Sequence, residues 1–169
     1  MAGDLLGRTA MVTGAGRGIG LAIARALSER GAKVALVDIA DLAGIEKPAG
    51  SLAVRADVTR PDQVAGAIET IVATFGGLQI LVNNAGICPL TIFDEISEAE
   101  WDRVLAVNLK GAFLCCQEAL PHLRQAGTHG RVINIASVGG QMGGLLVGAH
   151  YAASKAGLIG LTKTLAKVL

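Results

Sequence analysis

The stretch TGAGRGIG, residues 13–20, lies between an apolar run typical of a β-strand and an apolar stripe with helical spacing. Its glycines follow the order Gly14-x-x-x-Gly18-x-Gly20 rather than the G-x-G-x-x-G spacing. Glycines at a strand-to-helix turn let the backbone approach a pyrophosphate and aim the N–H groups of the helix start at its charge. The loop therefore predicts dinucleotide binding, although such a turn can also serve only to reverse the chain. The candidate coenzyme contacts are Gly14, Gly16, Arg17, Gly18, Ile19 and Gly20.

The alternation of strand and helix seen around this loop continues along the chain. Apolar runs of strand length recur, and longer segments with helical periodicity separate them. This alternation predicts an α/β fold, a doubly wound parallel sheet with helices on both faces. We expect residues 1–169 to form a single dinucleotide-binding domain, incomplete at its C-terminal end, with the strand order 3-2-1-4-5. The predicted strands are TAMV, KVALV, LAV, QILV and RVINI.

The second predicted strand, KVALVDI, brings Asp38 to its end. A carboxylate at this place accepts hydrogen bonds from the hydroxyls of an adenosine ribose. It would repel a 2′-phosphate by about 3 kcal/mol per unit charge at ~5 Å and an effective dielectric constant of ~20. The next two residues, Ile39 and Ala40, offer no positive charge to relieve that repulsion. The alternative is an aspartate that caps a turn. Together with the glycine loop, Asp38 favours NAD as the cofactor over NADP.

The composition argues against several classes of partner. Fifteen basic and 14 acidic residues leave a formal charge of +1, so neither nucleic acid nor an anionic membrane is an expected partner. The three cysteines, Cys88, Cys115 and Cys116, lack the spacing of metal ligands, and the three histidines are scattered, so we expect no metal. The N-terminal residues do not resemble a secretory signal. We expect a cytoplasmic protein.

The segment YAASK places Tyr151 and Lys155 on one face of a predicted helix, about 6 Å apart along its axis. Taken alone, this spacing also fits two surface side chains whose stems lie on apolar neighbours. Oxidation of an alcohol requires a base for the hydroxyl proton while hydride leaves the carbon. A phenol has an ordinary pKa of about 10, so it serves as that base only where a nearby cation favours the phenolate.

Other segments complete a larger pattern, because NNAG, residues 83–86, follows the fourth predicted strand and Asp57 and Val58 follow the third. In this order and spacing the motifs resemble the short-chain dehydrogenase/reductase family over essentially the whole chain. The resemblance implies an NAD(P)-dependent oxidoreductase on a Rossmann fold. It also implies coenzyme contacts from Asp57, Val58, Asn84, Gly86, Tyr151 and Lys155, and a catalytic tetrad of Asn108, Ser137, Tyr151 and Lys155.

The resemblance assigns each member of the tetrad a role. Tyr151 is the acid/base, and Lys155 is its electrostatic partner and a donor to the nicotinamide ribose. Ser137 binds the substrate oxygen together with Tyr151; the alternative is a loop serine at a strand end. Asn108 holds a water that relays protons to Lys155. As a lone amide on an apolar helical stripe that runs from Trp101 to Leu120, Asn108 also fits a purely structural network.

The substrate is expected to be a small-molecule secondary alcohol or its ketone, and the segment QMGGLLVGAH, residues 141–150, is the expected local contributor to substrate choice. Within it, His150 fits a pocket position or an exposed helix cap. Cys88 is expected to border the cleft without acting as a nucleophile. A 3-oxoacyl thioester (acyl-carrier-protein) reductase is an alternative function, because AASKAGLIGLTK resembles those enzymes. A non-catalytic dinucleotide-binding sensor is the alternative from another class.

The final segment, LIGLTKTLAKVL, reaches Leu169 within a helical pattern and without a C-cap glycine. The resemblance implies further strands and a lid, so we expect a fragment, or the ordered part of something longer, with little turnover and with RVINI at an exposed sheet edge. It also implies a homodimer or homotetramer through the helices that carry Asn108 and Tyr151. Small residues for close approach of those helices are Gly111, Ala112, Ala156 and Gly160.

Overall fold

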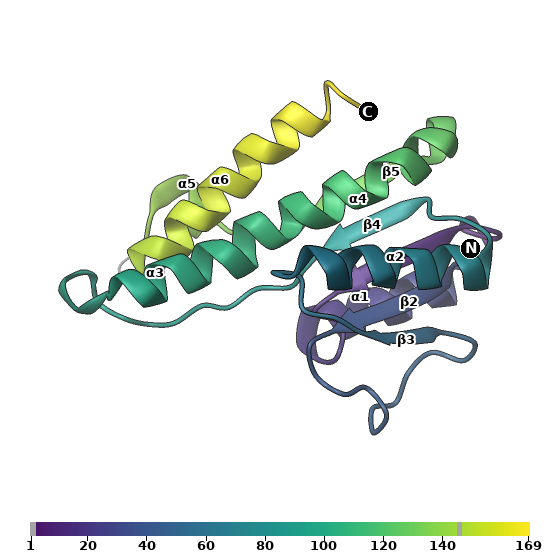
Figure 1. Ribbon diagram of the computed structural model, residues 1–169, viewed down its shortest axis with the longest axis horizontal. Helices are drawn as coiled ribbons and strands as arrows, with labels where there is room; N and C mark the ends of the chain where they lie inside the picture. Colours follow the sequence, from purple (N-terminus) through teal and green to yellow (C-terminus); the bar gives the residue numbers. More distant parts are fainter. Residues whose placement is uncertain (1–2, 145–146) are drawn as a thin grey trace.

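The computed structural model describes residues 3–144 and 147–169 and contains a five-stranded parallel sheet (Figure 1). The strand order is β3-β2-β1-β4-β5, and every neighbouring pair runs parallel. This confirms the predicted α/β class and the predicted order 3-2-1-4-5. The strands are β1 (Thr9–Thr13), β2 (Lys33–Asp38), β3 (Leu52–Arg55), β4 (Ile80–Asn83) and β5 (Arg131–Asn134).

Helices cover both faces of the sheet, with α1 behind it and α2 in front of it in Figure 1. The α-helices are α1 (Gly18–Glu29), α2 (Pro61–Phe75), α3 (Glu98–Leu105), α4 (Gly111–Gln125), α5 (Gly139–Met142) and α6 (Ala149–Leu165). Two 3-10 turns are η1 (Phe93–Glu95) and η3 (Gly127–His129), and one π-helical turn is η2 (Ala106–Lys110). The helix α6 packs against α3, α5 and η2.

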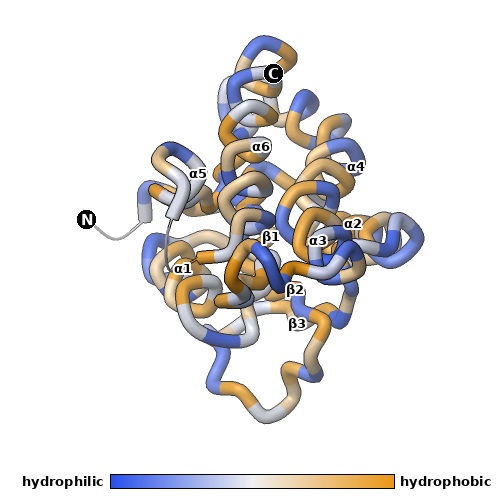
Figure 2. Tube along the Cα trace, turned by 90° about the vertical axis from the view of Figure 1, so that its left-hand side faces the viewer, coloured by the Kyte–Doolittle hydropathy of each residue, from blue (hydrophilic) through white to orange (hydrophobic). Residues whose placement is uncertain are grey.

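The core consists of two layers, one on each face of the sheet. Met11 and Leu81 point to the face that carries α2 and α4, whereas their neighbours Val12 and Val82 point to the face that carries α1. This division follows from the period of two along a strand, and because both faces are covered, every residue of β1 and β4 is buried. Figure 2 shows that hydrophilic and hydrophobic residues alternate along α4 and α6.

The apolar stripe predicted from Trp101 to Leu120 is interrupted in the structure. The turn η2 lies between α3 and α4, and a π-helical turn adds one residue to the helical path. The added residue rotates everything after it by about 100°. As a result Phe113, predicted to be in the stripe, is 45% exposed, while Cys115 and Ala119 are fully buried. The predicted stripe therefore holds at Val104, Asn108, Ala112 and Cys116, which are buried, and was wrong at Phe113.

Two of the small residues expected at a subunit interface face the interior of the chain instead. A Cβ atom added to Gly111 would lie 2.7 Å from Val58 Cγ2, and Ala112 is buried. The expectation that Gly111 and Ala112 admit a partner helix was therefore wrong, because η2 turns this end of α4 toward β3 and its following loop. Ala156 and Gly160 are exposed on α6. The homodimer or homotetramer stays a prediction.

The sheet ends at β5, as predicted for RVINI, and Ile133 is 45% exposed there. Within residues 3–144 and 147–169, no helix combines the length and the apolar character needed to cross a membrane.

Two buried thiols make the stability of this fold depend on pH. Burial raises the pKa of Cys115 to about 12 and that of Cys116 to about 11, from an ordinary value of 9.0. A raised folded-state pKa stabilises the fold below the unfolded pKa, and this stabilisation disappears as the pH rises through the folded pKa. Between pH 9 and pH 11, the free energy of unfolding should fall by up to about 1.4 kcal/mol per pH unit for each thiol. Urea denaturation at several pH values should show that the free energy of unfolding falls less steeply with pH in Cys115→Ala than in the wild type. Equal slopes for the two proteins would contradict the raised pKa of Cys115.

Candidate active site

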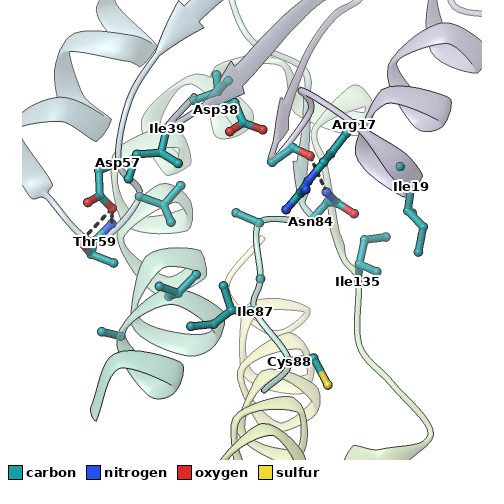
Figure 3. A pocket seen from close by; sticks show the side chains of 18 of the residues that line it. Arg17, Ile19, Asp38, Ile39, Asp57, Thr59, Asn84, Ile87, Cys88 and Ile135 are labelled. Atoms are coloured by element: carbon teal, nitrogen blue, oxygen red, sulfur yellow. Dashed lines mark hydrogen bonds between the residues drawn. The ribbon is translucent and has the colours of Figure 1, made fainter. Parts of the chain in front are cut away.

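A cavity of about 700 Å³ opens at the carboxyl ends of the strands, where the chain leaves the neighbouring strands β1 and β4 toward opposite halves of the sheet. Figure 3 shows Asp38 and Asp57 at one end of it and Cys88 at the other. Eleven of the residues predicted from the sequence line this one cavity: Gly14, Arg17, Gly18, Ile19, Asp38, Asp57, Val58, Asn84, Gly86, Tyr151 and Lys155. Four predicted residues, Gly16, Gly20, Asn108 and Ser137, lie outside that lining.

The glycine loop is held tightly against the loop that follows β4. Gly14 adopts a φ of +61°, which favours glycine. A Cβ atom at Gly20 would lie 2.2 Å from the Gly14 carbonyl oxygen, so only glycine allows this approach of backbone to backbone. The Asn84 amide donates to the carbonyls of Thr13 (2.9 Å) and Gly14 (3.0 Å). Gly20 therefore acts on the cavity indirectly, by fixing the loop that lines it.

Asp38 lies at the end of β2, as the sequence indicated, and is anchored by the glycine loop. Its Oδ2 accepts the N–H of Gly16 at 2.8 Å, and its Oδ1 accepts the N–H of Ala40 at 3.0 Å. Two arginines are relevant to the charge of this cavity. Arg17 lines it, and Arg55 on β3 donates to the carbonyl of Ile39 at 3.1 Å. Sequence reasoning named Arg17 as a coenzyme contact of the glycine loop but considered only the residues directly after Asp38 as its neighbours, so it missed Arg55.

Asp57 and Val58, predicted as coenzyme contacts, lie in a turn after β3 that the Asp57 side chain fixes. Asp57 Oδ1 accepts from both the N–H and the hydroxyl of Thr59, each at 2.8 Å. Val58 is buried and contributes an apolar wall to the cavity. Both predicted residues therefore lie at the cavity, together with Thr59, which the sequence analysis did not single out.

Tyr151 and Lys155 both line the cavity from the first turns of α6. The Lys155 Nζ lies 5.7 Å from the centroid of the Tyr151 ring and donates to the carbonyl of Ile135 at 2.6 Å. Lys155 is buried, and burial lowers its pKa. The carbonyl of Ile135, the residue that follows β5, therefore fixes the position of this ammonium group.

Ser137 is close to Tyr151, although it does not belong to the cavity lining. Its Oγ accepts the N–H of Gly139 at 3.2 Å. A Cβ atom at Gly139 would lie 3.5 Å from Ser137 Oγ and 3.9 Å from Tyr151 Cε1, so both side chains lie beside Gly139. The substrate segment predicted at residues 141–150 includes Leu145 and Leu146, which lie outside the described residues.

Asn108 lies in η2 and is buried, as its place on an apolar stripe indicated. Its side-chain amide accepts the N–H of Ile87 (2.8 Å) and donates to the carbonyl of Ile87 (2.9 Å) and to Ser154 Oγ (3.1 Å). Ser154 in turn donates to the Tyr151 carbonyl at 2.7 Å. Asn108 thus connects the loop after β4 to the backbone of Tyr151. Sequence reasoning missed Ser154, although it is the residue of YAASK that would lie beneath Tyr151 one helical turn away.

His150 differs from the exposed helix cap that the sequence analysis considered. The imidazole is fully buried, and its Nε2 lies 2.7 Å from Glu100 Oε1 on α3. The cap reading was wrong because the start of α6 packs against α3 rather than facing solvent. Cys88 borders the cavity, as predicted, and burial raises its pKa. Among the described residues, no three His, Cys, Asp or Glu side chains gather as a metal site would require.

Comparison with known proteins gives consistent matches. A family model described as short chain dehydrogenase matches residues 8–169. The 3-alpha-(or 20-beta)-hydroxysteroid dehydrogenase of Mycobacterium tuberculosis is 42% identical over 98% of this chain and 65% of its own. The 3-oxoacyl-(acyl-carrier-protein) reductase of Staphylococcus epidermidis is 43% identical over 97% of this chain and 70% of its own.

The solved structures include the ligand-free aldohexose dehydrogenase of Thermoplasma acidophilum, with a TM-score of 0.90 and 34% identity over 100% of this chain and 64% of that one. The chain spans 60 to 70% of the length of the curated relatives described here and a further oxidoreductase of Schizosaccharomyces pombe.

Proposed function

The chain belongs to the short-chain dehydrogenase family, and we propose that the protein transfers hydride between NAD(H) and a secondary alcohol or the matching ketone. The observation that carries this proposal is the single cavity that joins the glycine loop and Asp38 at one end to Tyr151 and Lys155 at the other. A coenzyme that spans from an adenosine ribose to a nicotinamide needs both ends in one site.

The residues of the cavity fit a dinucleotide. Gly20 allows the loop to close on itself, which leaves the N–H groups at the start of α1 free to face a pyrophosphate. Asp38 presents its carboxylate in the cavity, where ribose hydroxyls donate to it. The bound coenzyme supplies the hydride acceptor or donor. The side chains of this chain supply orientation and proton transfer.

The contacts around Tyr151 support a role for each member of the tetrad. The Tyr151 hydroxyl takes the substrate proton in oxidation and returns it in reduction. The Lys155 ammonium, fixed by the Ile135 carbonyl, favours the phenolate and donates to the nicotinamide ribose. Ser137, beside Gly139, donates to the substrate oxygen. Asn108 holds the Tyr151 backbone through Ser154, and its relay of protons to Lys155 through a water stays a prediction.

The coenzyme preference should depend on Asp38. If its carboxylate binds the ribose hydroxyls, NAD should bind at least about tenfold more tightly than NADP, a difference of about 1.4 kcal/mol. Asp38→Ala combined with Ile39→Arg should narrow or reverse that preference, because it removes a negative charge and adds a positive one. Titration of both coenzymes against both proteins measures the effect. Equal wild-type affinities would refute the assignment, since Arg17 and Arg55 would then outweigh Asp38.

The activity itself is tested by a panel of secondary alcohols with NAD and of ketones with NADH. Turnover is followed through the absorbance of the reduced nicotinamide. An alcohol oxidised with NAD, together with its ketone reduced with NADH, is the expected result. Coenzyme binding without turnover across the panel would support the non-catalytic sensor instead.

The runner-up is a 3-oxoacyl thioester reductase. It is favoured by the segment AASKAGLIGLTK and by 43% identity to the Staphylococcus epidermidis reductase. The position of Asp38 favours NAD(H) instead of the NADPH expected of those enzymes. Reduction of a short 3-oxoacyl thioester, assayed separately with NADPH and NADH, distinguishes the two functions: rapid reduction with NADPH would favour the runner-up.

A further inference from the structure

The buried imidazole of His150 is attached to the backbone of the neighbouring residue, Tyr151. Its Nδ1 accepts the N–H of Tyr151 at 2.9 Å, and the carbonyl of Gly148 accepts the same N–H at 3.0 Å. An accepting Nδ1 carries no proton, so the proton of the neutral ring lies on Nε2. Nε2 therefore donates to Glu100 Oε1, at 2.7 Å. The two ring nitrogens have different partners, and the carboxylate of Glu100 selects the tautomer that leaves Nδ1 free to accept.

The surroundings of His150 are shaped for this ring. A Cβ atom at Gly148 would lie 2.1 Å from His150 Cε1 and 3.2 Å from the carbonyl oxygen of Thr91, so only glycine leaves room for the imidazole. Hydrogen bonds from Thr91 and His150 hold the pKa of Glu100 below its usual range, which keeps the carboxylate charged. Figure 1 shows α3 beside the start of α6, where these residues meet.

Glu100 also departs from the role that its local sequence predicts. Ser97 caps α3 and accepts the N–H of Glu100 at 3.2 Å, and a Ser-x-x-Glu sequence normally lets the glutamate return to the cap residue. Here the Glu100 carboxylate instead contacts His150, 50 residues later in the chain. The Glu100 side chain, which could cap the start of α3, instead binds His150 on α6.

We infer that Glu100 and His150 form a positioning pair for Tyr151: the carboxylate orients the imidazole, and the imidazole holds the N–H of Tyr151 at the start of α6. This inference rests on the proposed function, in which Tyr151 is the acid/base. Ser154 and Asn108 hold the carbonyl of Tyr151 from the other side. The backbone of Tyr151 is thereby fixed at both its N–H and its C=O, so its ring enters the cavity in one orientation.

The test uses the fact that the chain has one tyrosine. Labelling with ¹⁵N-tyrosine gives a single backbone amide resonance, which reports the hydrogen bond to His150 without any assignment. In Glu100→Ala, the Tyr151 amide should shift and its hydrogen exchange should accelerate by up to about tenfold, because its N–H keeps the Gly148 carbonyl but loses the imidazole as an acceptor. The kcat should fall about tenfold, because the ring is misplaced, while the KM for NAD stays within about twofold.

Glu100→Gln is the conservative variant, because its carbonyl oxygen accepts from Nε2; it should restore the amide signal, its slow exchange and most of kcat. Glu98→Ala, an exposed site in the same helical turn, is the matched control and should change none of these quantities. An unchanged amide in Glu100→Ala, an altered amide with unchanged kcat, or equal effects in Glu98→Ala would overturn the inference. If the wild type shows no turnover, the proposed function fails, and the amide signal still decides whether the pair holds Tyr151.

Discussion

Tyr151→Phe is expected to lower the rate of hydride transfer by about 100- to 10,000-fold, the range typical of the loss of a general acid/base. The substitution removes one hydroxyl and keeps the ring, which lines the cavity. NAD should bind with nearly wild-type affinity, because the glycine loop and Asp38 are unchanged. The absorbance of the reduced nicotinamide measures the rate of turnover, and a titration of the same preparation with NAD measures its affinity.

Two lysines of α6 provide a control for this prediction. Lys155→Met removes the buried ammonium beside Tyr151 and should also reduce the rate strongly, whereas Lys163→Met, on an exposed part of the same helix, should not. A Tyr151→Phe protein with unaltered turnover would remove the acid/base assignment. Unaltered turnover in Lys155→Met would remove the electrostatic role of that lysine.

Gly20→Ala is expected to weaken both folding and coenzyme binding. The new Cβ would lie 2.2 Å from the Gly14 carbonyl oxygen and 2.5 Å from Asn84 Nδ2, so the backbone must move. We expect a loss of about 1–3 kcal/mol in the free energy of unfolding, as for other overpacked sites. NAD affinity should fall at least about tenfold, because the moved loop includes Gly14.

Gly44→Ala is the matched control, since a Cβ atom there meets nothing within 4 Å. Urea denaturation and NAD titration of both variants and the wild type separate the effects on folding and on binding. Wild-type affinity and stability in Gly20→Ala would show that the tight approach of Gly20 to Gly14 has no bearing on the coenzyme site.

The sheet could be predicted because short, local patterns of residues determine each of its strands. Each strand is a short apolar run bounded by polar or glycine residues, and alternation with helices leaves few arrangements of a parallel sheet. The strand order and edge position of β5 therefore agree with expectation. The predicted strand RVINI is one residue too long: Ile135 follows β5, and its carbonyl accepts from Lys155.

The candidate site was predictable where chemistry follows consecutive residues, as in the glycine loop, Asp38 and YAASK. Contacts between distant segments were not. Nothing in the sequence indicated that His150 would contact Glu100. The exposure of Phe113 depends on the extra residue in η2, which the sequence pattern did not reveal. Ser154 lies within the motif YAASK, but only the structure shows that its hydroxyl accepts a hydrogen bond from Asn108.

Transfer of deuterium from the carbinol carbon of a secondary alcohol tests the central claim most directly. The protein is incubated with NAD and an active alcohol from the panel, deuterated at that carbon, long enough for slow turnover to accumulate product. The reduced coenzyme is then isolated, and its mass is measured by mass spectrometry. We predict one deuterium in the NADH, with label transfer strongly reduced for Tyr151→Phe. Reduced coenzyme without deuterium, or equal transfer by the variant, would contradict hydride transfer at this site.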